Sequence, residues 1–352
     1  MDFTFHEDQT VLVDSVRKFL LNEVSPELIR ELWVSPSGRS EKIWAHLAEQ
    51  GLTGLSVPEA QGGMGLGDID WILIAQECGY YGLPEPLLES AWVAAALLTS
   101  LPDSDFRNNL LVAMADGSAR VAIGYPGSPL IADADQATLM LLAHGDKLYA
   151  VAPKDAHLTA QPSVDPSRRL FTVQFERQEK NCISNDANTL CAAALDRGAL
   201  AAAAQLLGLT QRMLDLSIDY TAQRKQFGKP VGSYQAVKHH LADVAIKLEF
   251  ARPVVHRAAH ALAHGEPDCS AFISHAKIAA SEVAHLAARH GIQVHGAMGY
   301  TWEMDLQIFV KMAWALDAAW GDRSFHLARV RAFVLESGVA LGPGCTFKET
   351  QQ

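Results

Sequence analysis

Two short segments combine residue types that can hold a phosphorylated, aromatic ligand. The first reads Arg224-Lys225-Gln226-Phe227-Gly228. An arginine fork can bind a diphosphate through two parallel hydrogen bonds, the Gln226 amide adds donors, and Phe227 offers a flat apolar face for a ring. The alternative is a solvated loop that buries its phenylalanine.

The second segment, Gln-Val-His-Gly-Ala-Met-Gly-Tyr, runs from Gln293 to Tyr300. It ends one predicted helix and opens another. Gly296 and Gly299 allow a ligand to approach the backbone closely, and Gln293 can present its amide from the last helical turn. Taken alone, the same pattern also fits an ordinary helix C-terminus.

The elements that must position these segments follow from hydrophobic spacing. Apolar residues recur every three or four positions near both ends of the chain, which predicts amphipathic helices. Short β-type runs with turn residues between them fill the middle, and Gly145-Asp146 between two apolar runs predicts a hairpin. The expected fold is therefore mainly α with a small β-domain. The expected sections are an N-terminal helical domain (1–118), a middle β-domain (119–186), a C-terminal helical bundle (187–340) and a tail (341–352).

Composition narrows the class of protein. Of the 352 residues, 49% are hydrophobic and 20% are charged, which is typical of an ordered globular protein. The net charge of -11 argues against a nucleic-acid partner, which would favour a basic surface.

The cysteines and the N-terminus favour a cytoplasmic location. Five scattered cysteines without a CxxC pair fit a reducing compartment. No secretory signal is recognisable at the N-terminus. The most apolar stretch, 190–209, contains Asp196, Arg197 and Gln205, so we interpret it as a buried helix and expect no membrane partner.

Together, the two segments resemble the signatures of the acyl-CoA dehydrogenase family. The stretch from Tyr220 to Asp243, with its Arg, Gln-Phe-Gly and His-Leu-Ala-Asp, is close to one family signature, and His290 to Glu303 looks like the "GGxGY" signature. Gly51-Leu52 through Gly62-Gly63-Met64-Gly65 is similar to a third, N-terminal motif. The resemblance covers essentially the whole chain.

The resemblance implies a helical domain, a β-domain and a four-helix bundle, with FAD bound across a subunit interface. By the family pattern, Arg224, Gln226 and Phe227 contact the pyrophosphate and adenine side of an FAD, usually that of the neighbouring subunit. Gln235 falls at a cofactor-lining position, and Gln293 with Gly296 cradles the diphosphate side. The implied reaction is α,β-dehydrogenation of an acyl-CoA thioester, with electrons leaving to an electron-transferring flavoprotein.

The chain departs from the family at the catalytic base. The usual base is a glutamate twenty residues beyond the tyrosine of "GGxGY", where this chain has Trp320. In a minority of the family the glutamate lies ten residues before a helix glycine, here Gly208, and that position is Gly198. The catalytic residue is therefore unknown. Asp196 coincides with an aspartate that binds the CoA pantetheine in relatives, and a register shift of two residues would make it a base candidate.

The β-domain departs as well. The run from Ile123 to Ser128 replaces the family's "TEPGAGSD" and lacks its Thr and Glu, and Ala297 replaces the second Gly of "GG". We therefore hypothesise that this chain is the base-lacking subunit of a heteromeric acyl-CoA dehydrogenase, with a second subunit of the same family as partner. The rivals are a self-sufficient homo-oligomer that uses Asp196 as base, and a non-enzymatic structural partner.

A metal site is not expected. His256, His260 and His264 recur at helical spacing, but no carboxylate or cysteine completes a ligand set in the sequence pattern. We interpret them as an exposed helical stripe.

Overall fold

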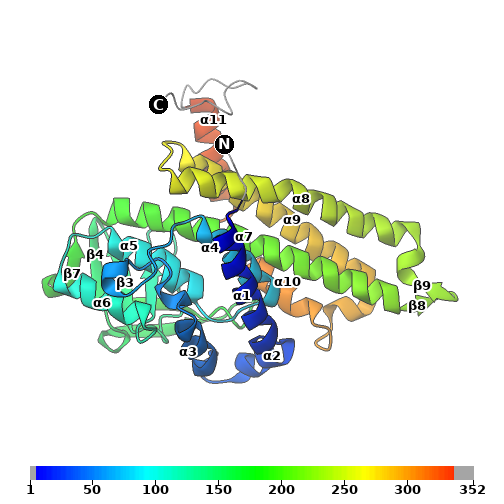
Figure 1. Cartoon of the computed structure of the whole chain (residues 1–352), viewed down its shortest axis with the longest axis horizontal. Helices are drawn as coiled ribbons and strands as arrows, with labels where there is room; N and C mark the ends of the chain where they lie inside the picture. The colour runs from blue at the N-terminus through cyan, green and yellow to red at the C-terminus, as the bar shows by residue number, and fades with distance from the viewer. Residues whose placement is uncertain (1–4, 337–352) are drawn as a thin grey trace.

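A computed structural model describes residues 5–336, so the predicted tail lies outside the described residues. Within this range the chain forms an N-terminal helical part, a β-domain and long C-terminal helices (Figure 1). The prediction of a mainly helical chain with a small β-domain is confirmed. The predicted borders fall just before the first strand of the β-domain and at Asp186, which precedes the longest helix.

The N-terminal part is a set of short helices around one apolar core. Ser25, Ser40 and Ser104 begin three of them, because each side chain accepts a backbone N–H in the first turn. The elements are α1 (Glu7–Glu23), α2 (Pro26–Val34), α3 (Glu41–Glu49), η1 (Leu52–Gly54), η2 (Glu59–Gln61), α4 (Asp70–Tyr81), the π-helix η3 (Leu88–Ala94), α5 (Ala95–Thr99) and α6 (Asp105–Ala115).

The middle part contains two small sheets. The first has the order β1-β3-β4-β7, with β1 parallel to β3 and the other pairs antiparallel, and the second has the antiparallel order β2-β6-β5. Gly145-Asp146 forms the predicted hairpin loop, since His144 pairs with Lys147. The elements are β1 (Val121–Gly124), β2 (Ile131–Ala132), β3 (Leu139–His144), β4 (Lys147–Val151), η4 (Pro153–Asp155), β5 (Ala156–Gln161), β6 (Leu170–Phe175), η5 (Glu179–Asn181) and β7 (Cys182–Ser184).

The C-terminal part is a bundle organised around α7 (Ala187–Gln223), which packs against α4, α8, α9 and α10. By length and composition α7 could cross a membrane, but 72% of its most apolar window is buried inside the molecule. The remaining elements are β8 (Lys225–Gln226), β9 (Lys229–Pro230), η6 (Val231–Ser233), α8 (Gln235–Ala263), α9 (Cys269–His295), η7 (Gly296–Tyr300), α10 (Leu306–Asp317) and α11 (Arg323–Glu336).

Glycines let α4 and α7 approach each other at backbone distance. A Cβ on Gly208 of α7 would lie 1.9 Å from the Gln76 carbonyl oxygen, and one on Gly79 of α4 would lie 2.1 Å from that of Gln205. Both positions therefore exclude any larger residue, and the two helices form one rigid layer.

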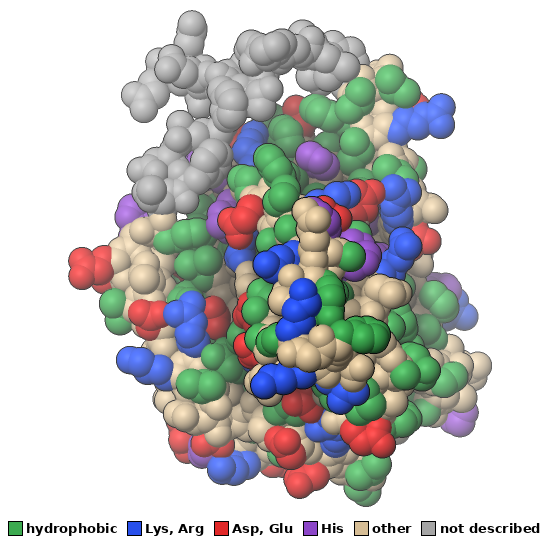
Figure 2. All heavy atoms as spheres, turned by 90° about the vertical axis from the view of Figure 1, so that its right-hand side faces the viewer, with side chains coloured by type: hydrophobic (Ala, Val, Ile, Leu, Met, Phe, Trp, Pro, Cys, Tyr) green, Lys and Arg blue, Asp and Glu red, His purple; other side chains and the backbone are tan. Residues whose placement is uncertain are grey.

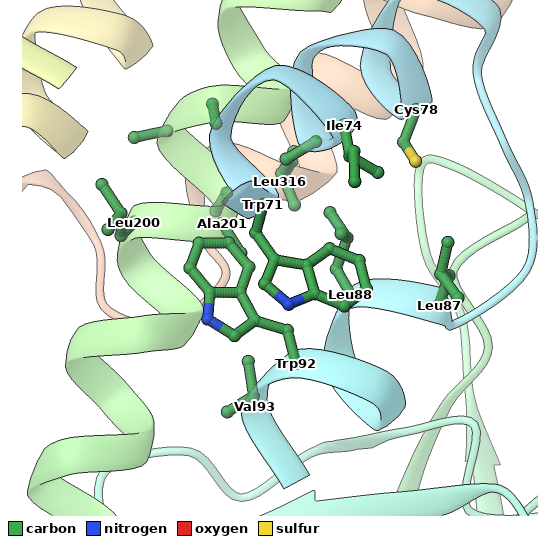
Figure 3. Close-up of a cluster of buried hydrophobic side chains, with 14 of the residues drawn as sticks. Trp71, Ile74, Cys78, Leu87, Leu88, Trp92, Val93, Leu200, Ala201 and Leu316 are labelled. Carbon is green, nitrogen blue, oxygen red and sulfur yellow. The ribbon is translucent and has the colours of Figure 1, made fainter. Parts of the chain in front are cut away.

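A tryptophan pair fixes η3 against this layer. The rings of Trp71 and Trp92 stack at 5.7 Å and 5°, next to Leu200 and Ala201 of α7 (Figure 3). Both rings are fully buried, and the Trp92 indole N–H donates to Asp68 at 2.6 Å. Asp68 also accepts from Arg197 at 3.0 Å. The π-helical turn that follows the proline-rich segment 84–86 is thus held in one position.

Candidate cofactor site and proton-acceptor positions

The first predicted segment forms a projecting hairpin at one end of the bundle (Figure 1). Gln226 pairs with Lys229, so Phe227-Gly228 is a two-residue turn, and both residues have positive φ, 52° and 80°. Such a turn matches the twist of the paired strands, which is why glycine follows the ring. Phe227 is 92% exposed. The alternative of a loop that buries its phenylalanine is therefore wrong.

The second predicted segment ends α9. Gln293 lies exposed in the last helical turn, and Gly296 follows with φ 64° and ψ -142°. Within the described residues, a Cβ on Gly296 would meet no atom within 4 Å, so the backbone is open to a ligand. Gly299 has a different role, since a Cβ there would lie 2.8 Å from the Ile292 carbonyl oxygen.

The two segments lie side by side at the same end of the bundle. The His295 ring stacks on Tyr220 with 4.2 Å between centroids, and the Tyr220 hydroxyl donates to the His295 carbonyl at 3.3 Å. His290 Nδ1 lies 2.8 Å from the His240 carbonyl, which brings the start of α8 alongside. Burial lowers the pKa of His295, so this ring stays neutral in its stack.

The face that these segments form suits a dinucleotide such as FAD. Arg224, Gln226, Phe227, Gln235, Gln293 and Gly296 are all exposed on it. Lys225 and Lys229 add positive charge, and Figure 2 shows Lys and Arg side chains grouped with hydrophobic ones in the middle of this end of the molecule. Cations for a diphosphate, an open backbone and an exposed ring fit the cofactor.

The two family positions for the base lie in contact elsewhere in the molecule. A Cβ on Gly198 would lie 2.1 Å from Cδ2 of Trp320, so the indole occupies the space that a side chain at 198 would need. The other partner of the indole is Tyr125 of the β-domain, stacked at 4.8 Å and 12°. No carboxylate is present at either position. The sequence indicated the missing base but not this aromatic pair, whose members are far apart in the chain.

Side chains of α9 and α11 fix the segment that carries Trp320 through hydrogen bonds. Trp320 and Gly321 have φ of 58° and 100°, a conformation that favours glycine at the second position. His326 Nε2 donates to the Trp320 carbonyl at 3.1 Å, and the Ser274 hydroxyl donates to Nδ1 at 3.0 Å. Burial lowers the pKa of His326 to about 4, which keeps the imidazole neutral for this pair of bonds. Lys277 donates to the Asp317 carbonyl at 2.7 Å and fixes the start of the same segment.

A cavity of about 130 Å³ lies beside the aromatic pair, between the β-domain and the helices. Glu89 of η3 and Arg168 of the β-domain line it, together with Tyr125 and Trp320. Neither charged residue was a candidate from the sequence. A glutamate within the apolar run Leu87 to Trp92 is the signal that could have found the first, whereas nothing local distinguishes Arg168 from Arg169.

Asp196 lies apart from this cavity, on the side of α7 that faces α9 and α11. Its Oδ1 accepts from Arg329 at 2.7 Å, and its Oδ2 accepts from the Ser270 hydroxyl. Its side chain is 8% exposed. Both oxygens thus have a partner within the chain, and the contact of Asp196 with CoA stays a prediction.

The three histidines near the end of α8 have separate partners, and the interpretation as an exposed stripe is wrong for His256 and His260, which are partly buried. His256 lies edge-on to Phe5 and near the Gln76 amide, and burial lowers its pKa. His260 Nδ1 lies 3.3 Å from Glu266, and the ring of His264 stacks on that of His260. The imidazole nitrogens of the stripe do not converge on one point.

Comparisons with known proteins agree with this architecture. Family profiles for the acyl-CoA dehydrogenase N-terminal and C-terminal domains match residues 6–118 and 189–335. The acyl-CoA dehydrogenase IpdE2 of Mycobacterium tuberculosis is 33% identical over 311 residues, which covers 87% of this chain and 91% of that protein.

Solved structures share the fold. Butyryl-CoA dehydrogenase from Megasphaera elsdenii superposes with a TM-score of 0.86 at 20% identity, covering 95% of this chain and 100% of that one. The ChsE4-ChsE5 complex from Mycobacterium tuberculosis gives a TM-score of 0.84 at 22% identity, covering 95% and 99%.

Proposed function

The chain belongs to the acyl-CoA dehydrogenase family, and we propose that it is the base-lacking subunit of a heteromeric, FAD-dependent member. A partner subunit of the same family supplies the proton-abstracting carboxylate. The two act together on an acyl-CoA thioester in lipid, steroid or dicarboxylate breakdown, in the cytoplasm, and an electron-transferring flavoprotein receives the electrons.

One observation carries this proposal. Trp320 and Gly198, the two family base positions, pack against each other, and Tyr125 stacks on the outer face of the indole. The exposed face formed by Arg224, Phe227 and their neighbours meanwhile retains the groups that suit a dinucleotide. This arrangement supports a chain that binds the cofactor at one end and lacks the family's base at both of the expected positions.

This chain's own residues would hold the cofactor rather than transform the substrate. The Arg224 fork would bind the diphosphate, Gln226 and Gln293 would donate amide hydrogen bonds, and Phe227 would cover the adenine side. FAD, when bound, supplies the hydride acceptor for the β-hydrogen. The α-proton goes to the partner's carboxylate.

The ChsE4-ChsE5 complex, which shares the fold, contains two different proteins. Its composition supports a two-subunit arrangement for this chain. The rival that uses Asp196 as base is disfavoured, since Arg329 and Ser270 occupy both carboxylate oxygens.

Flavin content and activity of two preparations test the proposal. The chain is purified alone and after co-expression with the product of a neighbouring gene. The FAD content, the mass and the rate of acyl-CoA dehydrogenation of each preparation are measured. We expect little FAD and no turnover alone, and FAD with turnover in the complex. Full FAD and turnover alone would establish the homo-oligomer. No FAD in either preparation would leave the structural-partner interpretation.

A further inference from the structure

Two adjoining cavities lie between η3, the β-domain and α10. The larger, of about 130 Å³, extends beside Tyr125 and Trp320, and the smaller, of about 80 Å³, extends toward Arg39 and Glu85. Glu89, Asp133 and Arg168 line both. These three charged residues take no part in the proposed cofactor site.

Two of the three arginines that line the cavities already have a carboxylate partner. Arg39 pairs with Asp133, and Arg120 pairs with Glu41. Within residues 5–336, no carboxylate lies within ion-pair distance of Arg168, the half-buried third. A guanidinium at the wall of a cavity without an anion is an incomplete pair.

Burial raises the pKa of each of the four carboxyl groups that line the cavities, Glu85, Glu89, Asp133 and Asp165, and so shifts them toward their protonated form. Burial raises the pKa of Glu89, and the Arg168 charge is the largest effect that opposes it. Burial also raises the pKa of Glu85 to about 7. Glu85 Oε1 accepts from the Ser40 backbone N–H at 2.7 Å, while its buried Oε2 has no partner among the described residues. A protonated carboxyl can donate a hydrogen bond, so these groups complement an acceptor.

A second positive charge, on Lys277, lies close enough to Arg168 for the two to repel. Lys277 is 1% exposed, and burial lowers its pKa to about 8, with Arg168 among the charges that lower it further. A cationic ligand would therefore meet the repulsion of Arg168. An anionic ligand would pair with the Arg168 guanidinium, and the raised pKa of Glu89 favours a carboxyl group that donates to it.

We propose that these cavities bind the carboxylate group of a small organic acid, held by Arg168 with the Glu89 side chain beside it. The carboxylate can come from a free acid, or from the far end of the acyl group of an acyl-CoA. The second source rests on the proposed function and would specify its substrate as a dicarboxylic acyl-CoA. The first source is independent of it.

Binding to the full chain is measured by calorimetry with pentanoate, and with 1-pentanol as the probe that lacks a carboxylate. We expect pentanoate to bind below 10 mM and 1-pentanol not to bind. Arg168→Met should weaken pentanoate binding at least tenfold, whereas Arg331→Met, which removes an exposed charge on α11, should change it less than twofold. Glu89→Gln, which keeps a hydrogen-bond donor, should bind within threefold, and Glu89→Leu should bind at least fivefold more weakly.

A second pair of probes separates the two sources. Glutaryl-CoA and butyryl-CoA are compared on the complex with the partner subunit and on the chain alone. Tighter binding of glutaryl-CoA that disappears in Arg168→Met identifies the acyl-CoA source, and equal binding of the two identifies the free acid.

The proposal is overturned if pentanoate does not bind below 10 mM, or if Arg168→Met binds it as the unmodified chain does. Melting temperatures of all variants distinguish lost binding from lost folding. If Arg168→Met does not fold, binding is measured with Arg168→Lys instead. Because pentanoate binding is measured without FAD or turnover, its failure is distinct from failure of the two-subunit proposal.

Discussion

The indole of Trp320 packs against Gly198 so closely that a Cβ on residue 198 would lie 2.1 Å from the indole Cδ2. The two residues come from α7 and from the connection between α10 and α11. They are also the two positions at which the family places its base. Each residue therefore depends on the other: the absence of a side chain at 198 makes room for the ring, and the ring excludes a carboxylate at 198.

Gly198→Ala should destabilise the protein by about 1–3 kcal/mol, because the added methyl overpacks the indole. The same change at a free helix position would stabilise by about 1 kcal/mol. Trp320→Ala should remove the penalty, so that Gly198→Ala becomes neutral or favourable in that background. Urea unfolding of the four variants gives the coupling energy.

Gly208→Ala on the same helix is the matched control. Its Cβ would meet the Gln76 carbonyl oxygen at 1.9 Å, far from Trp320, so Trp320→Ala should not rescue it. Equal rescue at both glycines would show that the indole does not pack on Gly198 specifically.

Phe227→Ala should lower FAD retention in the complex with the partner subunit at least tenfold. The side chain is 92% exposed, so the free energy of unfolding of the chain should change by less than about 0.5 kcal/mol. Flavin absorbance per protein after gel filtration measures the first effect, and urea unfolding measures the second. Phe106→Ala, an exposed phenylalanine of α6, should leave flavin content unchanged. Full flavin in Phe227→Ala would remove this ring from the cofactor site.

Asp196→Asn should destabilise the chain by about 1–3 kcal/mol, because it leaves the Arg329 guanidinium without its anion. Arg329→Met should cost less in the Asp196→Asn background than in the unmodified chain, since the partner is already gone. Ser270→Ala, which removes only the hydroxyl, should cost about 1 kcal/mol.

The same variant separates two roles for Asp196. If Asp196 were the base, Asp196→Asn would abolish turnover of the folded complex in addition to lowering its stability. We expect the lower stability alone, with turnover of the folded complex within a few fold of that of the unmodified complex.

His326 should make stability depend on acid pH. Burial lowers its native pKa to about 4 from an ordinary 6.5, so between these values the unfolded chain binds more protons. The contribution of His326 is therefore fully present above about pH 6.5 and is lost as the pH falls toward 4. His326→Gln should reduce the drop in urea midpoint between pH 7 and pH 5. His256 and His295, whose pKa values burial also lowers, should retain the rest of the drop. An identical drop in the variant would contradict this origin.

Local sequence patterns predicted most of the fold because they act over a few residues. Apolar spacing of three and four fixes which side of α7, α8 and α9 is buried. Two hairpin turns also have a local origin, because their loop residues tolerate the tight backbone that a two-residue connection needs. These loops are Gly145-Asp146 and Phe227-Gly228. The residues proposed to bind the cofactor could be grouped by motif for the same reason, since Arg224 to Gly228 lie on one hairpin.

The sequence by itself determined that no carboxylate stands at position 320 or 198. Only the tertiary structure decided what replaces it, because Gly198, Trp320 and Tyr125 come from three separate elements that meet through long-range packing. Arg168 and Glu89 likewise line the same cavity only because the β-domain packs against η3 in the folded chain. Whether a charge has a partner depends on distances in space, and residue order along the chain does not fix those distances.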